Sequence, residues 1–309
     1  MVPPVPSRVI HTAQALVDVV VEVPTLPRRG ANVMATGHDR YAAGAVNILL
    51  AAARSGAECV HAGAHGEGPN GDLVREALTR EGVTLSAAMT PGEDTGICVV
   101  LLEASAERTF VTTQMAEREI TVESLAASAP VAGDLVCVSG YSLVGRTRDP
   151  LLEWLAGLDP EVVVILDPGA IFAELDERVQ ERMLAMADVW TSNMEEGEDL
   201  TGERGMLAAA AASLAYLPEG AVAIVRDGAK GCAVAVSGAE PVVVEGFPEK
   251  AIDTNGAGDT HTGVLAAERA RGTGWVEACR RANAAGAIKV TRRGPDTAPT
   301  AAQIDHYLA

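Results

Sequence analysis

The segment Ile252–Gly263, IDTNGAGDTHTG, lies between a strand-like stretch and an alanine-rich helix, and it determines how the rest of the chain is interpreted. It contains three small residues in succession, Gly256, Ala257 and Gly258. Their backbone amides would lie at the positive end of the helix dipole, where an anion binds favourably. Asp259 follows in the first helical turn, where the dipole should keep its carboxylate ionised and able to accept a hydroxyl proton. The segment therefore predicts an anion site beside a general base.

A simpler interpretation of the same segment stays open at this point. Asp253 or Asp259 could only cap the helix while the glycines form a turn, because an acid beside a glycine turn is common. The other motifs of the chain distinguish the two interpretations.

The composition indicates a soluble globular protein, since 48% of the 309 residues are hydrophobic and 21% are charged. The formal net charge of −18 argues against a nucleic-acid partner, although a helix N-terminus can still bind a small anion. No apolar run is long enough to span a bilayer, and residues 1–8 contain three prolines and no secretory core. We therefore expect a cytoplasmic protein without a membrane or nucleic-acid partner.

The cysteines predict neither a zinc site nor a disulfide framework. There are five of them, widely spaced and without a CxxC pair: Cys59, Cys98, Cys137, Cys232 and Cys279. Most lie in apolar stretches, so we expect reduced thiols in the core. Aromatic residues are only 3% of the chain, which predicts an aliphatic core with helices packed closely through alanine and glycine.

Predicted strands and helices alternate along the chain. One long β-type run covers Val9–Val23, and later strands are expected over 58–62, 135–139, 162–166, 189–191, 222–225, 232–236 and 242–245. Helices are expected over 45–54, 72–81, 151–158, 177–186, 205–217, 257–271, 275–290 and 301–308. This order predicts a mainly parallel sheet covered by helices on both faces. The early strands and a hairpin over 96–113 fit it less well and predict a small projecting sheet.

The glycine motif resembles the DTxGAGD signature of the ribokinase-like family, the PfkB carbohydrate kinases. The match has no gap and comprises Asp253, Thr254, Gly256, Ala257, Gly258 and Asp259. The resemblance covers nearly the whole chain and implies a single Rossmann-like domain over residues 1–309, with a β-sheet lid formed by parts of about 11–40 and 95–115. It implies phosphorylation of a small sugar by ATP with Mg²⁺, with Asp259 as the catalytic base and residues 256–258 as the anion hole. Asp253 would belong to a loop that binds a monovalent cation, K⁺, beside the turn at 293–296.

Asn193 and Glu196 resemble the family's NxxE motif, which organises Mg²⁺ and its waters near the phosphates. The two residues are three apart at a helix start and share one face, and oxygen ligands suit Mg²⁺. Taken alone, the spacing is better explained by a capping box. Only its occurrence together with the glycine motif favours a role at the metal.

The segment Val225–Cys232, VRDGAKGC, resembles the family's strand and Gly-x-x-Gly turn along the nucleotide phosphates. Gly228 and Gly231 fit that turn. Arg226 stands where a hydroxyl residue is common, and it could pair with a phosphate or point to solvent. Asn283 lies in a helix that resembles the one beside the adenine, or it could be an ordinary polar helix residue.

Candidate sugar-binding residues lie in the N-terminal half of the chain. Asp18 interrupts an apolar run and needs polar partners, such as sugar hydroxyls, unless it faces solvent as Glu22 suggests. In the stretch YAAGAVN, Asn47 matches the family's substrate-binding Asn and Gly44 is retained.

Two features of this half depart from the family pattern or extend it. Ala42 and Ala43 replace the glycine pair that the family has before its Asn, which puts a standard sugar-binding loop in doubt. Gln114 and Arg118, just after the predicted hairpin, are further candidates for contact with the sugar.

A second glycine pattern argues for a different class of protein. Gly66, Gly68 and Gly71 form GxGxxG, and Glu93 and Asp94 lie at about the distance expected in a dinucleotide site. However, the pattern follows the second strand–helix unit rather than the first, and the same stretch resembles the family's GxxGxDxxG region. Dinucleotide binding is therefore the weaker interpretation.

The combined prediction is an ATP-dependent sugar kinase that uses Mg²⁺ and K⁺. By analogy with the fold, the projecting sheet suggests a homodimer. Two alternatives stay open: a nucleoside kinase with the same phosphate site, and a protein that binds ligand without turnover.

Overall fold

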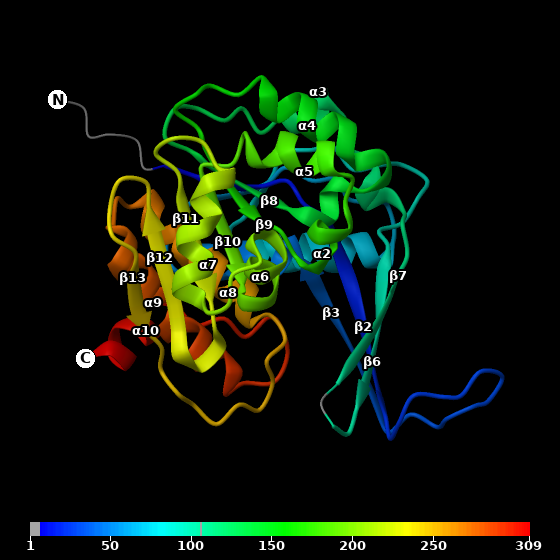
Figure 1. The fold of residues 1–309 in the computed structure, drawn as a ribbon. Helices are drawn as coiled ribbons and strands as arrows, with labels where there is room; N and C mark the ends of the chain where they lie inside the picture. Colours follow the sequence, from blue (N-terminus) through cyan, green and yellow to red (C-terminus); the bar gives the residue numbers. More distant parts are fainter. Residues whose placement is uncertain (1–6, 106) are drawn as a thin grey trace.

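The main sheet of the computed structural model, which describes residues 7–105 and 107–309, contains nine strands within that part of the chain (Figure 1). Their spatial order is β13 (Val242–Glu245), β12 (Gly231–Val236), β11 (Val222–Arg226), β10 (Val189–Asn193), β9 (Val163–Asp167), β8 (Leu135–Ser139), β1 (Val9–His11), β4 (Cys59–His61) and β5 (Thr84–Leu85). Neighbours from β11 to β5 are parallel, whereas β12 and β13 are antiparallel. The predicted mainly parallel sheet is confirmed.

Side chains alternate along these strands and so produce a hydrophobic core on each face. In β8, for example, Leu135 and Cys137 join one core while Val136 and Val138 join the other. The first core is covered by α1 (Ala45–Arg54), α2 (Pro69–Arg80), α8 (Ala257–Ala270), α9 (Trp275–Val290) and α10 (Ala301–Leu308). The second is covered by α3 (Val122–Ala126), α4 (Arg148–Ala156), α5 (Glu177–Leu184), α6 (Met194–Thr201) and α7 (Met206–Ser213).

A second, smaller sheet extends away from the main body (Figure 1). Its spatial order is β3 (Gly37–Gly44), β2 (Ala15–Val23), β6 (Ile97–Glu103) and β7 (Arg108–Thr112). Strands β2 and β6 are parallel, and the other two pairs are antiparallel. The antiparallel β6–β7 pair is the predicted hairpin, and the small projecting sheet is confirmed.

The prediction of one continuous strand over Val9–Val23 is wrong. The chain leaves the main sheet after β1 and enters the second sheet at β2, with Thr12–Gln14 as the crossing. There the Thr12 amide donates to the Cys137 carbonyl, and the Gln14 carbonyl accepts from the Ala45 amide at the start of α1. These fixed contacts end one strand before the next begins, although the apolar pattern continues through both.

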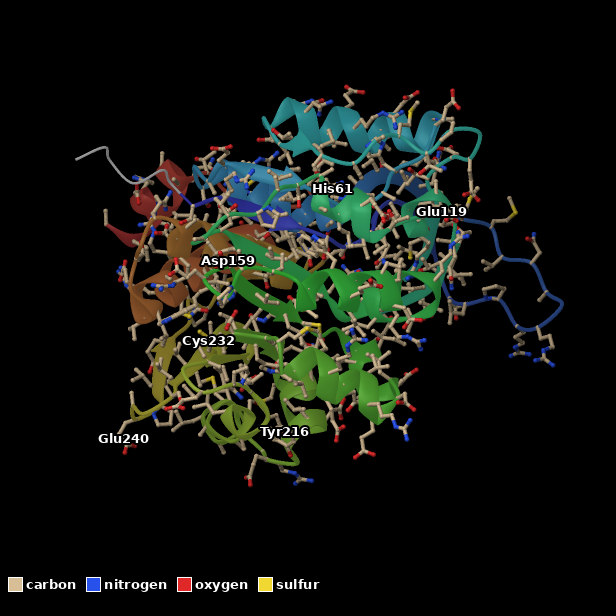
Figure 2. All side chains as sticks on the ribbon, turned by 90° about the horizontal axis from the view of Figure 1, so that it is seen from above. His61, Glu119, Asp159, Tyr216, Cys232 and Glu240 are labelled. Carbon is tan, nitrogen blue, oxygen red and sulfur yellow. The ribbon has the colours of Figure 1, made fainter. Side chains whose placement is uncertain are left out.

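The buried positions match the expected aliphatic, reduced core. All five cysteines lie in the described part of the chain and are buried as free thiols. Viewed from above, Cys232 and His61 lie within the layers, while the exposed Glu240 and Tyr216 lie toward the margin (Figure 2). Among residues 7–105 and 107–309, no helix combines the length and apolar character that crossing a membrane requires.

Close packing of α8 on α1 can be tested at Gly263. A Cβ there would overlap the Ile48 carbonyl oxygen and lie 2.8 Å from the Ala51 Cβ, so Gly263→Ala should lower the free energy of unfolding by about 1–3 kcal/mol in urea denaturation. Gly286→Ala in α9 is the matched control, because its Cβ would meet nothing closer than the Ala257 oxygen at 3.9 Å. Its stability should be unchanged or higher by up to about 1 kcal/mol. Equal stability of the two variants would contradict the tight α1–α8 contact.

Candidate active site

The carboxyl edge of the main sheet lines a cavity of about 940 Å³. The last residue of each of five neighbouring parallel strands lies in its wall: His11, Ser139, Asp167, Asn193 and Arg226. The N-terminus of α8 and part of β2 complete the wall. Open α/β sheets bind their ligands at this edge, so the cavity is the candidate active site.

The predicted anion site is a turn that ends at the start of α8. Gly256 is the N-cap residue with a left-handed φ of 75° and lies against Pro295, which brings the loop of Asp253 beside the 293–296 turn as predicted. The Ala257 amide donates to the Thr254 carbonyl at 3.2 Å. The amides of Gly256, Gly258 and Asp259 donate to no residue in the described part of the chain. Free amides at a helix N-terminus suit a phosphate oxygen.

Asp259 lies in this first turn and lines the cavity. Its Oδ2 accepts a hydrogen bond from Asn47 Nδ2 at 2.9 Å. Burial raises the pKa of Asp259 to about 6, although the Asn47 hydrogen bond and the nearby Arg226 and Lys289 oppose the rise. Burial is therefore the largest influence on this carboxylate among those that the surrounding side chains and solvent exert. The group is still mostly ionised at pH 7, as a general base must be.

Asp18 lines the same cavity from β2 and does not lie on a solvent-facing surface. Burial raises the pKa of Asp18 to about 7, and repulsion from Asp259 adds to the rise while a hydrogen bond from Asn255 opposes it. The structure thus brings together two carboxylates that are far apart in the sequence.

Gly44 and Asn47 also line the cavity, at the junction of β3 and α1. Gly44 has a φ of 67°, and a Cβ there would lie 2.5 Å from the Gln14 carbonyl oxygen, so this position requires glycine. Ala42 and Ala43 are buried in β3 and are absent from the cavity wall. Replacement of the family's glycine pair is therefore accommodated inside the second sheet.

The two candidates after the hairpin differ in their positions. Gln114 is exposed and does not line the cavity, so the expected sugar contact finds no support in its position. Arg118 is buried and lines it, with Nη1 donating to the Tyr141 carbonyl oxygen at 2.9 Å. The short helix at 116–118 turns Arg118 inward, a change of direction that the local sequence does not reveal.

Asn193 and Glu196 form the capping box of α6 and also line the cavity. Asn193 Oδ1 accepts from the Glu196 amide, and Glu196 Oε2 accepts from the Asn193 amide, both at 2.9 Å. Burial raises the pKa of Glu196, and the neighbouring Asp167 raises it further. Both interpretations of this motif are therefore compatible with the structure.

Asp167 is a site residue that our sequence analysis missed. It is the last residue of β9, directly after an apolar run, and an acidic strand end was the available signal. With Asn193 and Glu196 it offers oxygen donors suited to Mg²⁺. Within residues 7–105 and 107–309, no group of three or more His, Cys, Asp or Glu residues could hold a metal by itself. Mg²⁺ would therefore need phosphate or water oxygens as well, as it usually does.

The Arg226 guanidinium does not point to solvent and is held by groups of the chain itself. Nη1 donates to the Gly258 carbonyl oxygen at 3.0 Å and to Thr262 Oγ1 at 2.9 Å, and Nη2 lies 3.5 Å from Asp167 Oδ2. These contacts contradict the solvent-pointing alternative, whereas a contact with phosphate stays a prediction, since Arg226 lines the cavity. The residue connects the end of β11 to the first two turns of α8.

The remaining predicted nucleotide residues, Gly228, Gly231 and Asn283, also line the cavity. Gly228 begins the short turn after β11, and Gly231 is the first residue of β12. The Asn283 side chain is already bonded, because its Nδ2 donates to the carbonyls of Val244 and Glu245 and its Oδ1 contacts His261 Nε2 at 3.2 Å. Asn283 therefore shapes this wall while its polar atoms are engaged by the protein.

The GxGxxG pattern cannot bind a pyrophosphate in this arrangement. The Asp94 carboxylate accepts hydrogen bonds from the amides of Asn70 and Gly71 at the start of α2, at 3.1 and 2.9 Å. A Cβ on Gly68 would lie 2.6 Å from Asp94 Cγ, so the glycine leaves the space that the Asp94 side chain fills. Asp94 occupies the amides that a dinucleotide would need.

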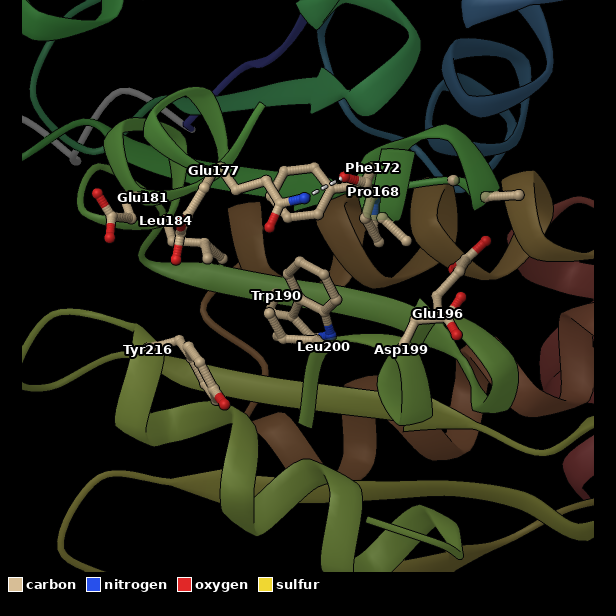
Figure 3. A pocket seen from close by; sticks show the side chains of 14 residues that line it. Pro168, Phe172, Glu177, Glu181, Leu184, Trp190, Glu196, Asp199, Leu200 and Tyr216 are labelled. Carbon is tan, nitrogen blue, oxygen red and sulfur yellow. Dashed lines mark hydrogen bonds between the residues drawn. The ribbon is translucent and has the colours of Figure 1, made fainter. Parts of the chain in front are cut away.

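A smaller depression of about 220 Å³ lies beside α5 and α6 and shares Gly169, Ala170 and Glu196 with the cavity wall (Figure 3). Phe172 and Trp190 meet edge to face at its base, with ring centres 5.5 Å apart. Four acidic residues line it, Glu177, Glu181, Glu196 and Asp199, and none of its lining residues is basic. Its chemistry does not suit a phosphorylated ligand.

Burial of the Asp18 carboxylate predicts a pH-dependent stability. Because the pKa of Asp18 is raised to about 7, the folded protein binds a proton that the unfolded chain releases above about pH 4, so the free energy of unfolding should fall as the pH rises from 4 to 7. Asp18→Asn should be more stable than wild type at pH 8, by about 1–3 kcal/mol, and nearly equal to it near pH 4. Urea denaturation at both pH values, with the exposed Asp199→Asn as control, would measure the difference. A constant difference between the two pH values would contradict the raised pKa.

Comparison with known proteins identifies the family. The chain matches the model of the pfkB family carbohydrate kinases over residues 10–301. It is 29% identical over 301 residues to a protein of Escherichia coli K12 named "uncharacterized sugar kinase YegV", covering 95% of this chain and 92% of that one. It is 27% identical to a ribokinase of Haemophilus influenzae, covering 94% and 95% of the two chains.

Solved structures with the same fold include the Arabidopsis thaliana ribokinase complexed with ribose and ATP. That structure has a TM-score of 0.80 and 24% identity, covering 98% of this chain and 99% of the other. A putative ribokinase II from E. coli has a TM-score of 0.84 at 22% identity, with the same coverage. These likenesses establish the ribokinase fold, and the family model covers nearly the whole sequence. The chain therefore belongs to the pfkB family of carbohydrate kinases.

Proposed function

We propose that this sugar kinase transfers the γ-phosphoryl group of ATP to a hydroxyl of a small sugar, with Asp259 as the general base. As a member of its family the chain is an ATP-dependent sugar kinase. One observation carries the proposal: the Asp259 carboxylate lies beside the free amides of the α8 N-terminus, in the cavity that Asp18 and Asn47 also line. A base and an anion site must be adjacent for a hydroxyl oxygen to attack phosphorus.

The nucleotide is proposed to lie along the ends of β10 and β11 and the C-terminal half of α9. The glycine turn at 228–231 and the wall formed by Asn283 and Gly286 leave room for it. Two related structures were solved with ATP, the Arabidopsis ribokinase and the E. coli ribokinase II, which supports a nucleotide site in this fold.

Asp167, Asn193 and Glu196 would hold Mg²⁺ together with phosphate and water oxygens. When bound, the ion would neutralise part of the phosphate charge. The protein's own amides at 256, 258 and 259 would stabilise charge on the transferred group, because their dipoles are already oriented.

The sugar is proposed to lie between Asp18, Asn47 and the second sheet. Asn47 donates to one oxygen of Asp259 and so orients the carboxylate, whose other oxygen can accept the hydroxyl proton. Asp18 would accept hydrogen bonds from further hydroxyls of the sugar. Arg118 lines the same cavity and could contribute donors.

The second sheet is proposed to act as a lid on a single domain covering residues 1–309. Its strands β2 and β7 contribute Asp18, Phe110 and Thr112 to the cavity wall. Closure over the bound sugar would exclude water and limit ATP hydrolysis. The homodimer stays a prediction, which molar-mass measurement in solution would test.

Removal of the proposed base should abolish most turnover without unfolding the protein. Asp259→Asn should lower kcat by about 10²–10⁴, the range typical of losing a general base. ADP formation from Mg-ATP would be measured against pentoses, hexoses, sugar phosphates and nucleosides, with Asp305→Asn as a control remote from the cavity. Near-normal turnover in Asp259→Asn would overturn the assignment, and a signal with nucleosides alone would replace the proposed substrate class.

The hydrogen bond from Asn47 should be visible in the pH dependence of the reaction. With a pKa of about 6 for Asp259, kcat/KM of the wild type should rise with pH through about 6 as the base ionises. Asn47→Ala removes a donor that lowers this pKa, so the rise should move to higher pH. A lower plateau with an unchanged midpoint would show that Asn47 contacts only the sugar.

A further inference from the structure

Lys289 is fully buried in α9, with none of its side chain exposed to solvent. Its Nζ donates to the main-chain oxygen of Asp253 at 3.1 Å. A buried ammonium is costly unless oxygen atoms and negative charges surround it. Its position therefore needs an explanation from the groups around it.

Three carboxylates lie close enough to stabilise the ammonium. Burial lowers the pKa of Lys289, whereas Asp253, Asp259 and Asp296 oppose the change. The ammonium in turn acts to lower the pKa of Asp259, the proposed base. Lys289 thus connects the loop before α8 with the carboxylate at its start.

The oxygens of Asp253 are all engaged by groups of the chain itself. Oδ1 accepts from Arg108 Nη2 at 2.6 Å and from the Asn255 amide at 2.9 Å. Oδ2 accepts from the Gly294 amide at 2.9 Å, and the main-chain oxygen accepts from Lys289. Burial acts to raise the pKa of Asp253, but the two amides, Lys289 and Arg108 together lower it.

These contacts do not fit the monovalent-cation loop that the family resemblance implied. A potassium ion needs several oxygen atoms in place of its hydration shell. Here the oxygens of Asp253 are taken, and two fixed positive charges, Lys289 and Arg108, would repel a third cation in the same loop.

We propose that Lys289 replaces the monovalent cation and holds the loop before α8, so that this kinase works without K⁺. Asp253 is three residues before Gly256, so fixing its carbonyl also fixes the turn that presents the free amides. Lys289 acts through this loop and is therefore a positioning residue. Arg108 connects β7 of the second sheet to the same carboxylate. The part of the inference that concerns turnover rests on the proposed function, whereas the part that concerns the loop does not.

The experiment compares wild type, Lys289→Met and the exposed control Lys250→Met in tetramethylammonium, sodium and potassium chloride at one ionic strength. Methionine keeps an unbranched side chain and removes the charge. The readouts are Tm without any sugar and the rate of ADP formation with the acceptor that turns over. For wild type and Lys250→Met, we expect the same Tm in all three salts and rates within about twofold, a difference of only about 0.4 kcal/mol.

Lys289→Met should become dependent on added cations. In tetramethylammonium its rate should fall about tenfold or more, equivalent to about 1.4 kcal/mol, and potassium should restore part of it and raise Tm by binding the folded state. Restoration by a cation separates a missing charge from lost packing. A loss that no cation restores, with Tm unaffected by potassium, would reduce Lys289 to a packing residue and overturn the proposal.

Potassium dependence of the wild type would also overturn it, either as activation of several fold or as a higher Tm in potassium than in tetramethylammonium. This comparison decides the question even if Lys289→Met does not fold. If no acceptor turns over in any salt, the proposed function fails, while an unchanged wild-type Tm still supports an occupied cation loop.

Discussion

The concentration of negative charge at the carboxyl edge of the sheet is the constraint on which the rest of the site depends. Asp18, Asp167, Glu196 and Asp259 all line one cavity. Burial is the main cause of the raised pKa of three of them, Asp18, Glu196 and Asp259. Such a cluster destabilises the folded state unless cations are fixed beside it. Under the proposed function these oxygens face the metal, the sugar and the transferred proton, which would account for a cluster that destabilises the fold.

Fixed cations of the chain itself balance this charge and also set the geometry of α8. Arg226 connects the end of β11 to Gly258 and Thr262. Lys289 holds the loop before the helix through Asp253. The helix start is therefore held from both sides, which leaves its free amides in one orientation before any ligand arrives. Such preorganisation is how a protein stabilises developing charge without moving at the moment of reaction.

Short patterns in this chain were compatible with more than one interpretation until distant residues were brought beside them. The spacing of Asn193 and Glu196 predicted both a capping box and a metal site, and the structure has the box at the cavity wall. Gln114 and Arg118 were both candidates for contact with the sugar, but only Arg118 lines the cavity. Asp94 has the spacing of a ribose-binding acid, yet it caps α2. Such outcomes depend on backbone direction, which local sequence does not contain.

The sequence by itself determined the class of fold, the glycine turn before α8 and the carboxylate in its first turn. Each is specified locally, by hydrophobic periodicity or by residues adjacent in the chain. Only the tertiary structure decided which charges meet there. The approach of Asn47 and Asp18 to Asp259, the engagement of Arg226 and the burial of Lys289 against Asp253 all join residues far apart in sequence. Desolvation and Coulomb interaction act through space, so the protonation state of the site and the cations that fix it follow from the fold.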